Sequence, residues 1–325
     1  MTKKIKRWLL QMLVVVIVGF ALLNILACNI AYAMTHYAAG GARTPKPEDI
    51  SYLGKLKVLF TGVNLPRPVS DISPLELGAG CRVLSVAVGS NVTLCAWYRG
   101  LGKDKPLAIL FHGYGAEKTS MVREAKEFMA LGASVMLIDF RGSGGSSESY
   151  TTIGVCEADD VVAAFRYAND NLPHSSIVLF GKSMGAASIL RAVHVNHITP
   201  DAVILEAVFD TMFNTVCNRF RLLGIPSFPS ARLLVFWGGR QWGFDGFAHN
   251  PVDYARSLKC PSLFMHGDND VKATIADGRR VFAAVQGPKE FREFAALGHE
   301  DYIAKYPDEW RAAVAKIMRR RWVTE

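Results

Sequence analysis

The chain has 325 residues, half of them apolar, and carries 37 Lys and Arg against 29 Asp and Glu, for a formal charge of +8. This length fits one large core with a small accessory part. The basic excess lies partly at the two ends and accompanies no nucleic-acid-binding signature, so no nucleic-acid partner is expected. The six scattered cysteines include no C-x-x-C pair, so they predict no disulfide framework and no zinc site.

Residues 1–37 are predicted to be a membrane anchor. Four basic residues among the first seven precede a mostly apolar run, residues 8–37, without Lys, Arg, Asp or Glu. A signal peptide has an apolar core of about 7–15 residues and a spanning helix needs about 20, so the run favours an uncleaved anchor. A signal sequence cleaved near Ala33, with secretion of the rest, and a lipidated Cys28 are the alternatives.

The distribution of basic residues also predicts an orientation for a single-pass protein in the cell membrane. Basic residues stay on the cytoplasmic side, and they are denser before the apolar run than just after it. The N-terminus is therefore expected in the cytoplasm. The main domain is expected outside it, in the periplasm.

Beyond the anchor, residues 38–80 are a polar connector spotted with Pro and Gly, and residues 81–325 are predicted to form one α/β domain. The runs CRVLSVAVG and NVTLCAWY, joined by a Gly-Ser-Asn turn, predict a β-hairpin. From Pro106 onward, short buried-strand patterns such as LAILF, SVMLIDF, SIVLF and PSLFM alternate with helical patterns. This alternation predicts a mostly parallel sheet covered by helices on both faces, with its ligand beyond the carboxyl ends of the strands.

One segment interrupts this alternation. Residues 211–250 are rich in aromatic and aliphatic residues mixed with Gly and Pro, and they separate two predicted strands. The segment is too long for a simple crossover between strands. We therefore interpret residues 211–250 as an apolar lid over the site.

The stretch FGKSMGA, residues 180–186, allows two interpretations. A phosphate-binding loop would need a glycine six residues before Lys182, and that position holds Ser176. The pattern G-x-S-x-G around Ser183 instead follows a buried-strand run and precedes a helical pattern. A strand, a sharp turn and a helix are the context of a nucleophile elbow, so Ser183 is the predicted nucleophile.

A serine hydroxyl needs a base and an orienting carboxylate to act as a nucleophile. With this elbow the chain order is Ser, acid, His. Asp268 and Asp270 follow a late strand in HGDND, and His299 follows the last predicted strand in GHED. We expect His299 to be the base and Asp270, in preference to Asp268, to orient it. The expected donors to an oxyanion are the backbone N–H groups of Met184 and, in HGYG, of Tyr114.

Together HGYG, DFRGSGGS, GKSMGA, HGDND and GHED resemble the α/β-hydrolase superfamily. The branch that the chain resembles is that of membrane-anchored serine aminopeptidase-like and prolyl-oligopeptidase-like serine hydrolases. The resemblance covers roughly residues 82–320. It implies an eight-stranded, mostly parallel sheet and a Ser183–Asp270–His299 triad. Many relatives carry Asn where this chain has Tyr114, which affects the side chain of the oxyanion loop and not its backbone donor.

These observations predict a serine hydrolase that cleaves ester or related acyl bonds through an acyl-enzyme, as esterases, lipases and thioesterases do. The apolar lid favours hydrophobic acyl groups, and the anchor would place the site near small-molecule or lipid-like acyl substrates. No cofactor and no metal is expected. A serine peptidase or aminopeptidase, and a non-catalytic binding protein on the same fold, are the alternatives.

Overall fold

The computed structural model describes residues 3–45, 50–51, 53–54, 58 and 62–319. Its strands form a single sheet, and they are β1 (Arg82–Val88), β2 (Val92–Arg99), β3 (Leu107–Phe111), β4 (Ser134–Ile138), β5 (Ile177–Lys182), β6 (Ala202–Glu206), β7 (Ser262–Gly267) and β8 (Lys289–Phe294). The α-helices are α1 (Lys3–Thr35), α3 (Val122–Ala130), α4 (Glu157–Asn171), α5 (Met184–Asn196), α6 (Met212–Leu223), α7 (Ser230–Trp242), α8 (Pro251–Tyr254), α9 (Ile275–Ala284), α10 (Tyr302–Lys305) and α11 (Pro307–Arg319). Short 3₁₀ turns are η2 (Pro74–Leu77), η3 (Lys118–Met121), η4 (Gly246–Ala248) and η5 (Ala255–Ser257).

The eight strands lie in the order β1-β2-β4-β3-β5-β6-β7-β8. Strand β2 runs antiparallel to both of its neighbours, and the pairs from β4 to β8 are parallel. The predicted hairpin is confirmed, with Val88 opposite Val92 across its turn. Chain order reverses beside β3, because β4 lies on one side of it and β5 on the other. Loops that follow strands at such a reversal diverge and leave a crevice for a ligand.

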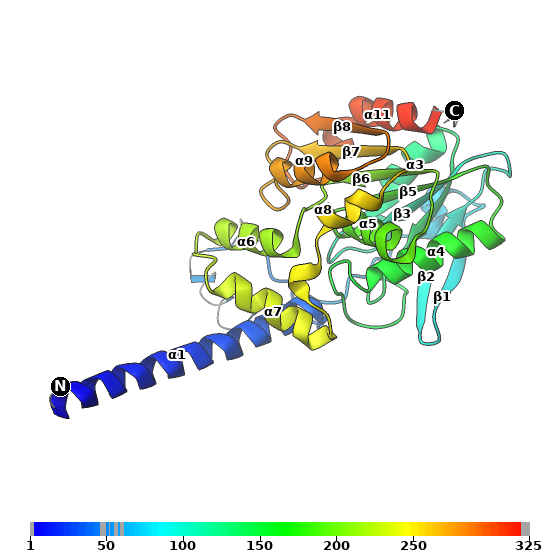
Figure 1. Ribbon diagram of the computed structural model, residues 1–325. Coiled ribbons are helices and arrows are strands. Elements are labelled where there is room, and N and C mark those ends of the chain that lie inside the picture. Colours follow the sequence, from blue (N-terminus) through cyan, green and yellow to red (C-terminus); the bar gives the residue numbers. More distant parts are fainter. Residues whose placement is uncertain (1–2, 46–49, 52, 55–57, 59–61, 320–325) are drawn as a thin grey trace.

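Both faces of the sheet are buried, as the continuous apolar runs predicted. Alternate residues of β3 point to opposite faces, so Ile109 joins one core cluster and Leu110 joins the other. The first cluster packs under α4, α5 and α9, and the second under α3 and α11. Figure 1 shows these helices on both faces of the sheet. The predicted α/β fold class, with its eight-stranded and mostly parallel sheet, is confirmed.

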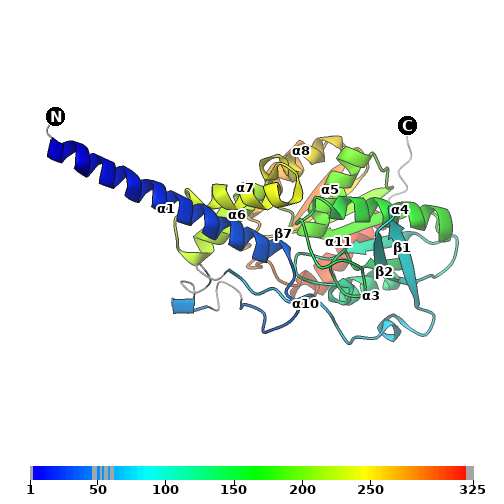
Figure 2. The ribbon, with the colours of Figure 1, turned by 90° about the horizontal axis from the view of Figure 1, so that it is seen from below.

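Helix α1 is 33 residues long and projects from the α/β body, with the N-terminus at its far end (Figures 1 and 2). By length and composition this helix could cross a membrane. A signal sequence near an N-terminus can meet the same criteria of length and composition. Its C-terminal part lies beside α7 in both views. Segment 211–250 forms α6, α7 and η4 between β6 and β7.

The described part of the connector, residues 38–80, contacts the body of the protein at several points. Within its described part, Ala38 forms a parallel bridge with Pro66, and η2 begins behind the cap residue Ser73. The Arg43 side chain donates a hydrogen bond of 2.9 Å to the Gly115 carbonyl. The connector is therefore joined to the loop that follows β3.

Candidate active site

Ser183 occupies a strained backbone position at the junction of β5 and α5. Its φ of 51° and ψ of −107° lie in a region that non-glycine residues avoid, at a typical cost of about 1–3 kcal/mol. The Ser183 N–H donates to the Glu206 carbonyl at 2.8 Å, and the Ser183 carbonyl accepts from Ala187 at 3.0 Å. These bonds to β6 and to α5 hold the turn in place. Strain that persists in this way is a feature of functional sites.

The two glycines of the elbow are needed for close backbone contact. A Cβ on Gly185 would collide with the carbonyl oxygen of Phe111 at the end of β3. A Cβ on Gly181 would come within 2.6 Å of the Gly185 and Ala186 backbone. Such contacts are shorter than side chains tolerate, so only glycine fits where the strand turns into the helix.

Lys182, between Gly181 and Ser183, forms a buried ionic cluster under the elbow. Its Nζ lies 2.8 Å from the Glu124 carboxylate and 2.9 Å from the Glu206 carboxylate. Trp310 Nε1 donates to the other Glu206 oxygen at 3.1 Å. Burial alone would lower the pKa of Lys182, but the two carboxylates outweigh it and raise that pKa well above its usual value. The cluster ties β5, β6, α3 and α11 together beneath the nucleophile position.

Asp270 and His299 are brought together although 29 residues separate them. His299 Nδ1 lies 2.6 Å from Asp270 Oδ2, and Asp270 Oδ1 accepts the N–H groups of Lys272 and Ala273 at 2.8 and 2.9 Å. Burial would raise the pKa of Asp270, but the hydrogen bonds from His299 and Ala273 outweigh it and lower that pKa. Asp268, the alternative acid, is exposed. The carboxylate beside His299 is therefore that of Asp270.

Two other histidines near the strand ends are buried and support turns. His112 Nε2 accepts the Phe140 N–H at 3.1 Å and its Nδ1 donates to the Gly113 carbonyl at 2.8 Å, which fixes a neutral ring. His266 Nε2 lies 2.7 Å from the Ala273 carbonyl. Burial lowers the pKa of both rings. Both therefore fit a role in holding turns.

The loop after β3 lies against the elbow. A Cβ on Gly113 would lie 3.6 Å from the Lys182 carbonyl and 3.8 Å from Ser183 Cβ, so this loop passes close to the nucleophile turn. The Tyr114 side chain points elsewhere, because its hydroxyl donates at 2.6 Å to the carbonyl of Met34 near the end of α1. Burial raises the pKa of Tyr114, which keeps the hydroxyl protonated as a donor.

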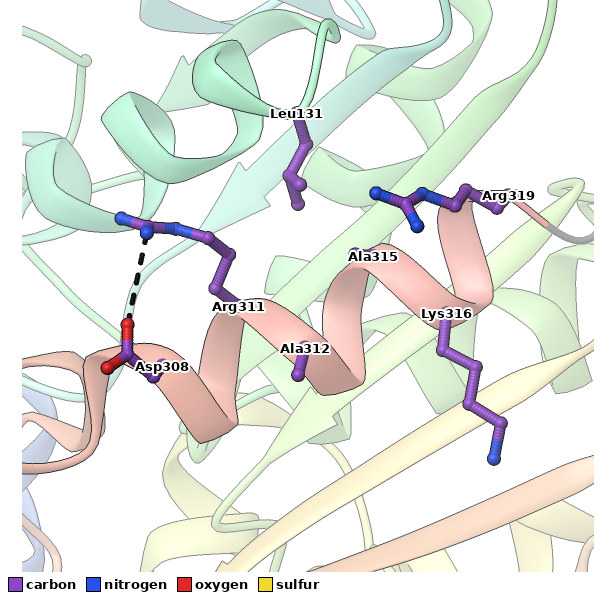
Figure 3. Close-up of a pocket in the computed structure, with 7 residues that line it drawn as sticks. All are labelled: Leu131, Asp308, Arg311, Ala312, Ala315, Lys316 and Arg319. Atoms are coloured by element: carbon purple, nitrogen blue, oxygen red, sulfur yellow. Dashed lines mark ion pairs between the residues drawn. The ribbon is translucent and has the colours of Figure 1, made fainter.

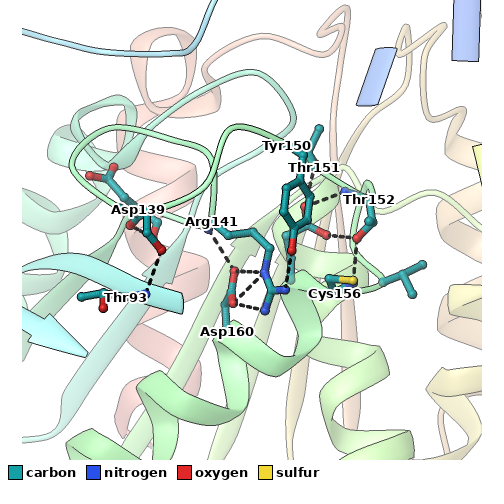
Figure 4. Close-up of polar contacts among 12 residues, drawn as sticks. Thr93, Asp139, Arg141, Tyr150, Thr151, Thr152, Cys156 and Asp160 are labelled. Atoms are coloured by element: carbon teal, nitrogen blue, oxygen red, sulfur yellow. Dashed lines mark hydrogen bonds and ion pairs between the residues drawn. The ribbon is translucent and has the colours of Figure 1, made fainter. Parts of the chain in front are cut away.

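A polar network orders the long loop after β4 (Figure 4). The buried Glu157 carboxylate accepts from the Thr151 hydroxyl, from the N–H and hydroxyl of Thr152 and from the Gly154 N–H, at 2.6–2.9 Å. These bonds enclose Ile153, whose φ is 56°. The Thr151 hydroxyl is also 3.5 Å from Met184 Sδ, so the loop contacts the residue that follows Ser183.

Two hollows in the described part of the chain differ in character. Figure 3 shows one over α11, where Arg311 pairs with Asp308 and where Leu131, directly after α3, forms the edge. That hollow lies away from the carboxyl ends of the strands. The other is an apolar cavity between α1, α6, α7 and the loop after β4. Only this second hollow adjoins the elements that surround Ser183.

Sequence reasoning missed several residues of this region. The ionic cluster of Lys182 has no local signature, because its glutamates come from α3 and β6. The Glu157 network was missed as well. A local signal existed, because hydroxyl and backbone N–H donors at residues 151–154 precede a glutamate at the start of a helix and can donate to its carboxylate. The contact between Tyr114 and Met34 joins residues 80 positions apart.

Comparison with known proteins agrees with this architecture. Residues 102–216 match the model of the family described as serine aminopeptidase, S33. An uncharacterized protein of Mycobacterium tuberculosis is 26% identical over 263 residues, which cover 79% of this chain and 84% of that protein. The acylamino-acid-releasing enzyme of Arabidopsis thaliana is 24% identical over 67% of this chain and 30% of that enzyme.

Among solved structures, the esterase Pf2001 of Pyrococcus furiosus superimposes with a TM-score of 0.66 at 24% identity. The superposition covers 79% of this chain and 97% of the esterase. At this identity the likeness shows a shared fold. The family match and the fold together support a hydrolase.

Proposed function

We propose that this chain, which has the α/β-hydrolase fold and carries a segment of the serine aminopeptidase type, is a serine hydrolase of acyl esters and related acyl bonds. The observation that carries the proposal is the Asp270–His299 contact of 2.6 Å beyond the strand ends, at the edge where Ser183 sits on strained backbone. Acyl transfer by a serine needs a base with an orienting carboxylate, and Asp270 and His299 supply such a pair beyond the same strand ends as the half-buried Ser183.

In the proposed reaction, Ser183 Oγ attacks the substrate carbonyl and its proton passes to His299 Nε2. Asp270 accepts the Nδ1–H of His299, which leaves Nε2 free as the base and stabilises the imidazolium that forms. The tetrahedral intermediate collapses, the bond to the alcohol oxygen breaks, and His299 returns the proton to that oxygen. Water then attacks the acyl-enzyme in the same way and releases the acid.

The negative charge of the tetrahedral intermediate needs two preorganised donors. We assign this role to the backbone N–H groups of Met184 and Tyr114. Met184 begins α5, so its N–H has no partner within the helix and points out of the helix N-terminus. The Gly113 backbone passes close to Ser183, since even a Cβ added to Gly113 would lie within 4 Å of Ser183 Cβ, and this supports a place for the Tyr114 N–H beside the nucleophile.

A peptidase is the second candidate, because the matched family is described as serine aminopeptidase and one relative releases acylamino acids. An aminopeptidase needs a carboxylate to bind the free ammonium group of its substrate. Segment 211–250 contains one acidic residue, Asp245, and its carboxylate already accepts the Phe247 N–H at 2.9 Å as the cap of η4. The apolar character of the segment instead favours an acyl substrate.

The test is labelling of the purified full-length protein with a fluorophosphonate probe, which reacts with activated serines. We expect the wild type to be labelled, Ser183→Ala to be unlabelled, and Asp270→Ala and His299→Ala to react at least about 10³-fold more slowly. Asp268→Ala is the matched control and should react like the wild type. A folded wild type that resists the probe, or one still labelled after Ser183→Ala, would overturn the proposal.

A substrate panel then separates the two candidates. We expect p-nitrophenyl esters of fatty acids to be hydrolysed with a higher kcat/KM than aminoacyl p-nitroanilides, because the lid offers an acyl group apolar surface and its single carboxylate, that of Asp245, already caps η4. The reverse order of kcat/KM would favour the peptidase.

A further inference from the structure

We infer that helix α1 forms one wall of the acyl pocket, so that the acyl chain of the substrate lies between α1 and the lid helix α7. The inference rests on the proposed function and names the substrate class of the same site, an ester of an unbranched alkyl acid. It assigns the N-terminal helix a part in substrate binding in addition to attachment to a membrane.

The cavity between these helices supplies the space. Its walls come from α1 at Ala31, Met34 and Thr35, from the loop after β4, from α6, and from α7 with the turn that follows it. About 50 Å³ is open to the centre of a water-sized sphere, several times the roughly 10–15 Å³ that one water needs. This narrow space suits the end of a single alkyl chain better than a ring or a branched group.

Small residues create the cavity. Ala31 on α1 and Gly238 and Gly239 on α7 line it. Gly239 is required for close packing, since a Cβ there would lie 2.5 Å from the Phe244 carbonyl oxygen, whereas Gly238 leaves room for a larger side chain. A Cβ added to Gly238 would meet no atom within 4 Å, so a side chain at this lining position has free space. A glycine inside a helix costs about 1 kcal/mol relative to alanine, and at Gly238 no close contact requires it. Alanine or leucine at position 238 would therefore occupy this space without a steric clash.

The lining offers nothing to a polar ligand. Its hydroxyl groups belong to Thr35, which donates to the Ala31 carbonyl at 3.0 Å, and to Thr152, which donates to Glu157 at 2.7 Å. Both are therefore already bonded, and the lining includes no charged side chain. A polar ligand would lose its hydrogen bonds to water without replacement, whereas an alkyl chain gains from leaving water.

The cavity begins close to the nucleophile turn. Thr152 and Ile153 line it, and the preceding residue, Thr151, contacts Met184 directly after Ser183. Met212 also lines it and begins α6, the helix that follows β6. The cavity thus lies on the carboxyl side of the sheet, where an acyl group bound at Ser183 would extend.

The last turns of α1 are fixed in this position. Along one face of α1, Asn24 accepts from Trp237 Nε1 at 3.2 Å and the Cys28 carbonyl accepts from Gln241 at 2.9 Å. At the helix end, where carbonyls have no helical partner, Met34 accepts from the Tyr114 hydroxyl and Thr35 accepts from the Thr151 N–H at 2.8 Å. The end of α1 is therefore held in place by α7, by the loop after β3 and by the loop after β4.

The first test fills the cavity from α7. We compare kcat/KM for p-nitrophenyl laurate with kcat/KM for p-nitrophenyl butyrate. We expect the ratio of the two to fall in Gly238→Ala and to fall further, roughly tenfold, in Gly238→Leu, because one excess methylene group in a filled pocket lowers kcat/KM by about that factor. Gly19→Leu is the matched control, since Gly19 also lies in a helix with open space around it and is outside the cavity. It should keep the wild-type ratio.

A measurement of the melting temperature shows that the variants are folded. Replacing a helical glycine that has free space should raise the melting temperature, because alanine and leucine favour the helix. If Gly238→Leu does not fold, Gly238→Ala carries the test. A folded variant with the wild-type ratio of laurate to butyrate hydrolysis would overturn the inference.

The second test does not depend on hydrolysis. A fatty acid with a terminal diazirine is photo-crosslinked to the full-length Ser183→Ala protein, with excess laurate as competitor, and the labelled peptides are mapped by mass spectrometry. We expect crosslinks in the end of α1 and in α7 that excess laurate suppresses. The Gly238→Leu substitution should lower the yield of these crosslinks roughly tenfold. Labels that lie elsewhere would overturn the inference even if the wild type hydrolyses esters. Labels at α1 and α7 in a protein that resists the fluorophosphonate would support the pocket and reject the proposed activity.

Discussion

At the scale of single residues, the site combines one strained residue with one strongly oriented pair. Hydrogen bonds to β6 and α5 hold Ser183 in its strained conformation. Three hydrogen bonds to the Asp270 carboxylate, one of them from His299, fix the Asp270–His299 pair. The acid therefore has a fixed position and stays ionised, which lets it hold the imidazole of His299 in one orientation. An amide at the same position would keep the shape and lose the charge.

Asp270→Asn should lower kcat by about 10³–10⁴, because the amide favours the wrong tautomer of His299. It should also change how stability depends on pH. The pKa of Asp270 is lowered on folding, so its charge stabilises the wild type above the ordinary carboxyl pKa of about 3.9 and that contribution is lost as the pH falls through the lowered value. Unfolding midpoints of both proteins across this range measure the difference. A difference that stays constant down to low pH would contradict the lowered pKa.

The sequence can suggest candidate residues where the chemistry has a local signature. Ser183 follows from its glycines, and Asp270 and His299 follow from their positions after late strands; the contact between these two side chains is found in the structure. The choice of Asp270 over Asp268 rested on position alone, whereas the structure places only Asp270 against His299. The Tyr114 side chain was not predictable, because its partner, Met34, belongs to a helix that no local pattern relates to the loop after β3.

At the scale of elements, β5 and the elements packed against it position Ser183. Lys182 is the last residue of β5, and its ammonium group bridges carboxylates of α3 and β6. Both glutamates are almost fully buried, at 1% and 0% exposure. Their charges cannot reach water if the lysine is removed, so this cluster should be the most sensitive point under the elbow.

Lys182→Met should destabilise the protein by about 3–5 kcal/mol, because two buried carboxylates lose their counter-ion. For a domain of this size that corresponds to a fall in melting temperature of roughly 10 °C. Lys103→Met, at an exposed position, is the matched control and should change stability by less than about 0.5 kcal/mol. A thermal melt of the detergent-solubilised protein measures both, and equal melting temperatures would show that the cluster does not hold the elbow.

Elements were predictable to different degrees. The strands were visible because parallel strands buried on both faces appear as unbroken apolar runs. The division of segment 211–250 into α6 and α7 was not visible, because Gly and Pro interrupt its apolar residues and no helical period stands out. Its interpretation as a lid remains a prediction, to which the Gly238 variants speak directly.

At the scale of the whole molecule, the N-terminal helix and the segment 211–250 form one continuous unit. Around it, Phe228, Phe236 and Phe247 are exposed by 75%, 49% and 37%, and Arg221, Arg232 and Arg240 are exposed as well. Exposed aromatic residues beside arginines suit the boundary between lipid and water, where anionic headgroups attract positive charge. We therefore expect this side of the domain to face the membrane that α1 enters.

If α1 is part of the pocket, it must remain in the mature protein. We expect a protein tagged at both ends to carry both tags in the membrane fraction, because cleavage near Ala33 would remove Ala31 and the residues that contact α7. Immunoblots of the cell fractions against each tag measure this. A C-terminally tagged species without the N-terminal tag, released into the soluble fraction, would show that α1 is a cleaved signal sequence.

The long apolar helix was predictable from hydropathy, and its use as a membrane anchor remains a prediction. Its packing was not predictable, because the contacts of Asn24, Cys28 and Ala31 with α7 depend on how the chain folds back over some two hundred residues. In the sequence these positions are only slightly more polar or smaller than their neighbours. The orientation in the membrane remains a prediction.

The length of α1 has a kinetic consequence. If α1 spans a bilayer, about 30 Å of its roughly 50 Å length lies in the hydrocarbon core, and the part beside α7 then stands directly above the lipid. An enzyme held at that height meets its substrates by lateral diffusion in two dimensions. Its turnover rate would then depend on the mole fraction of substrate within the leaflet. Diluting the substrate with inert lipid would lower the turnover rate, whereas diluting the membranes with buffer would leave it unchanged.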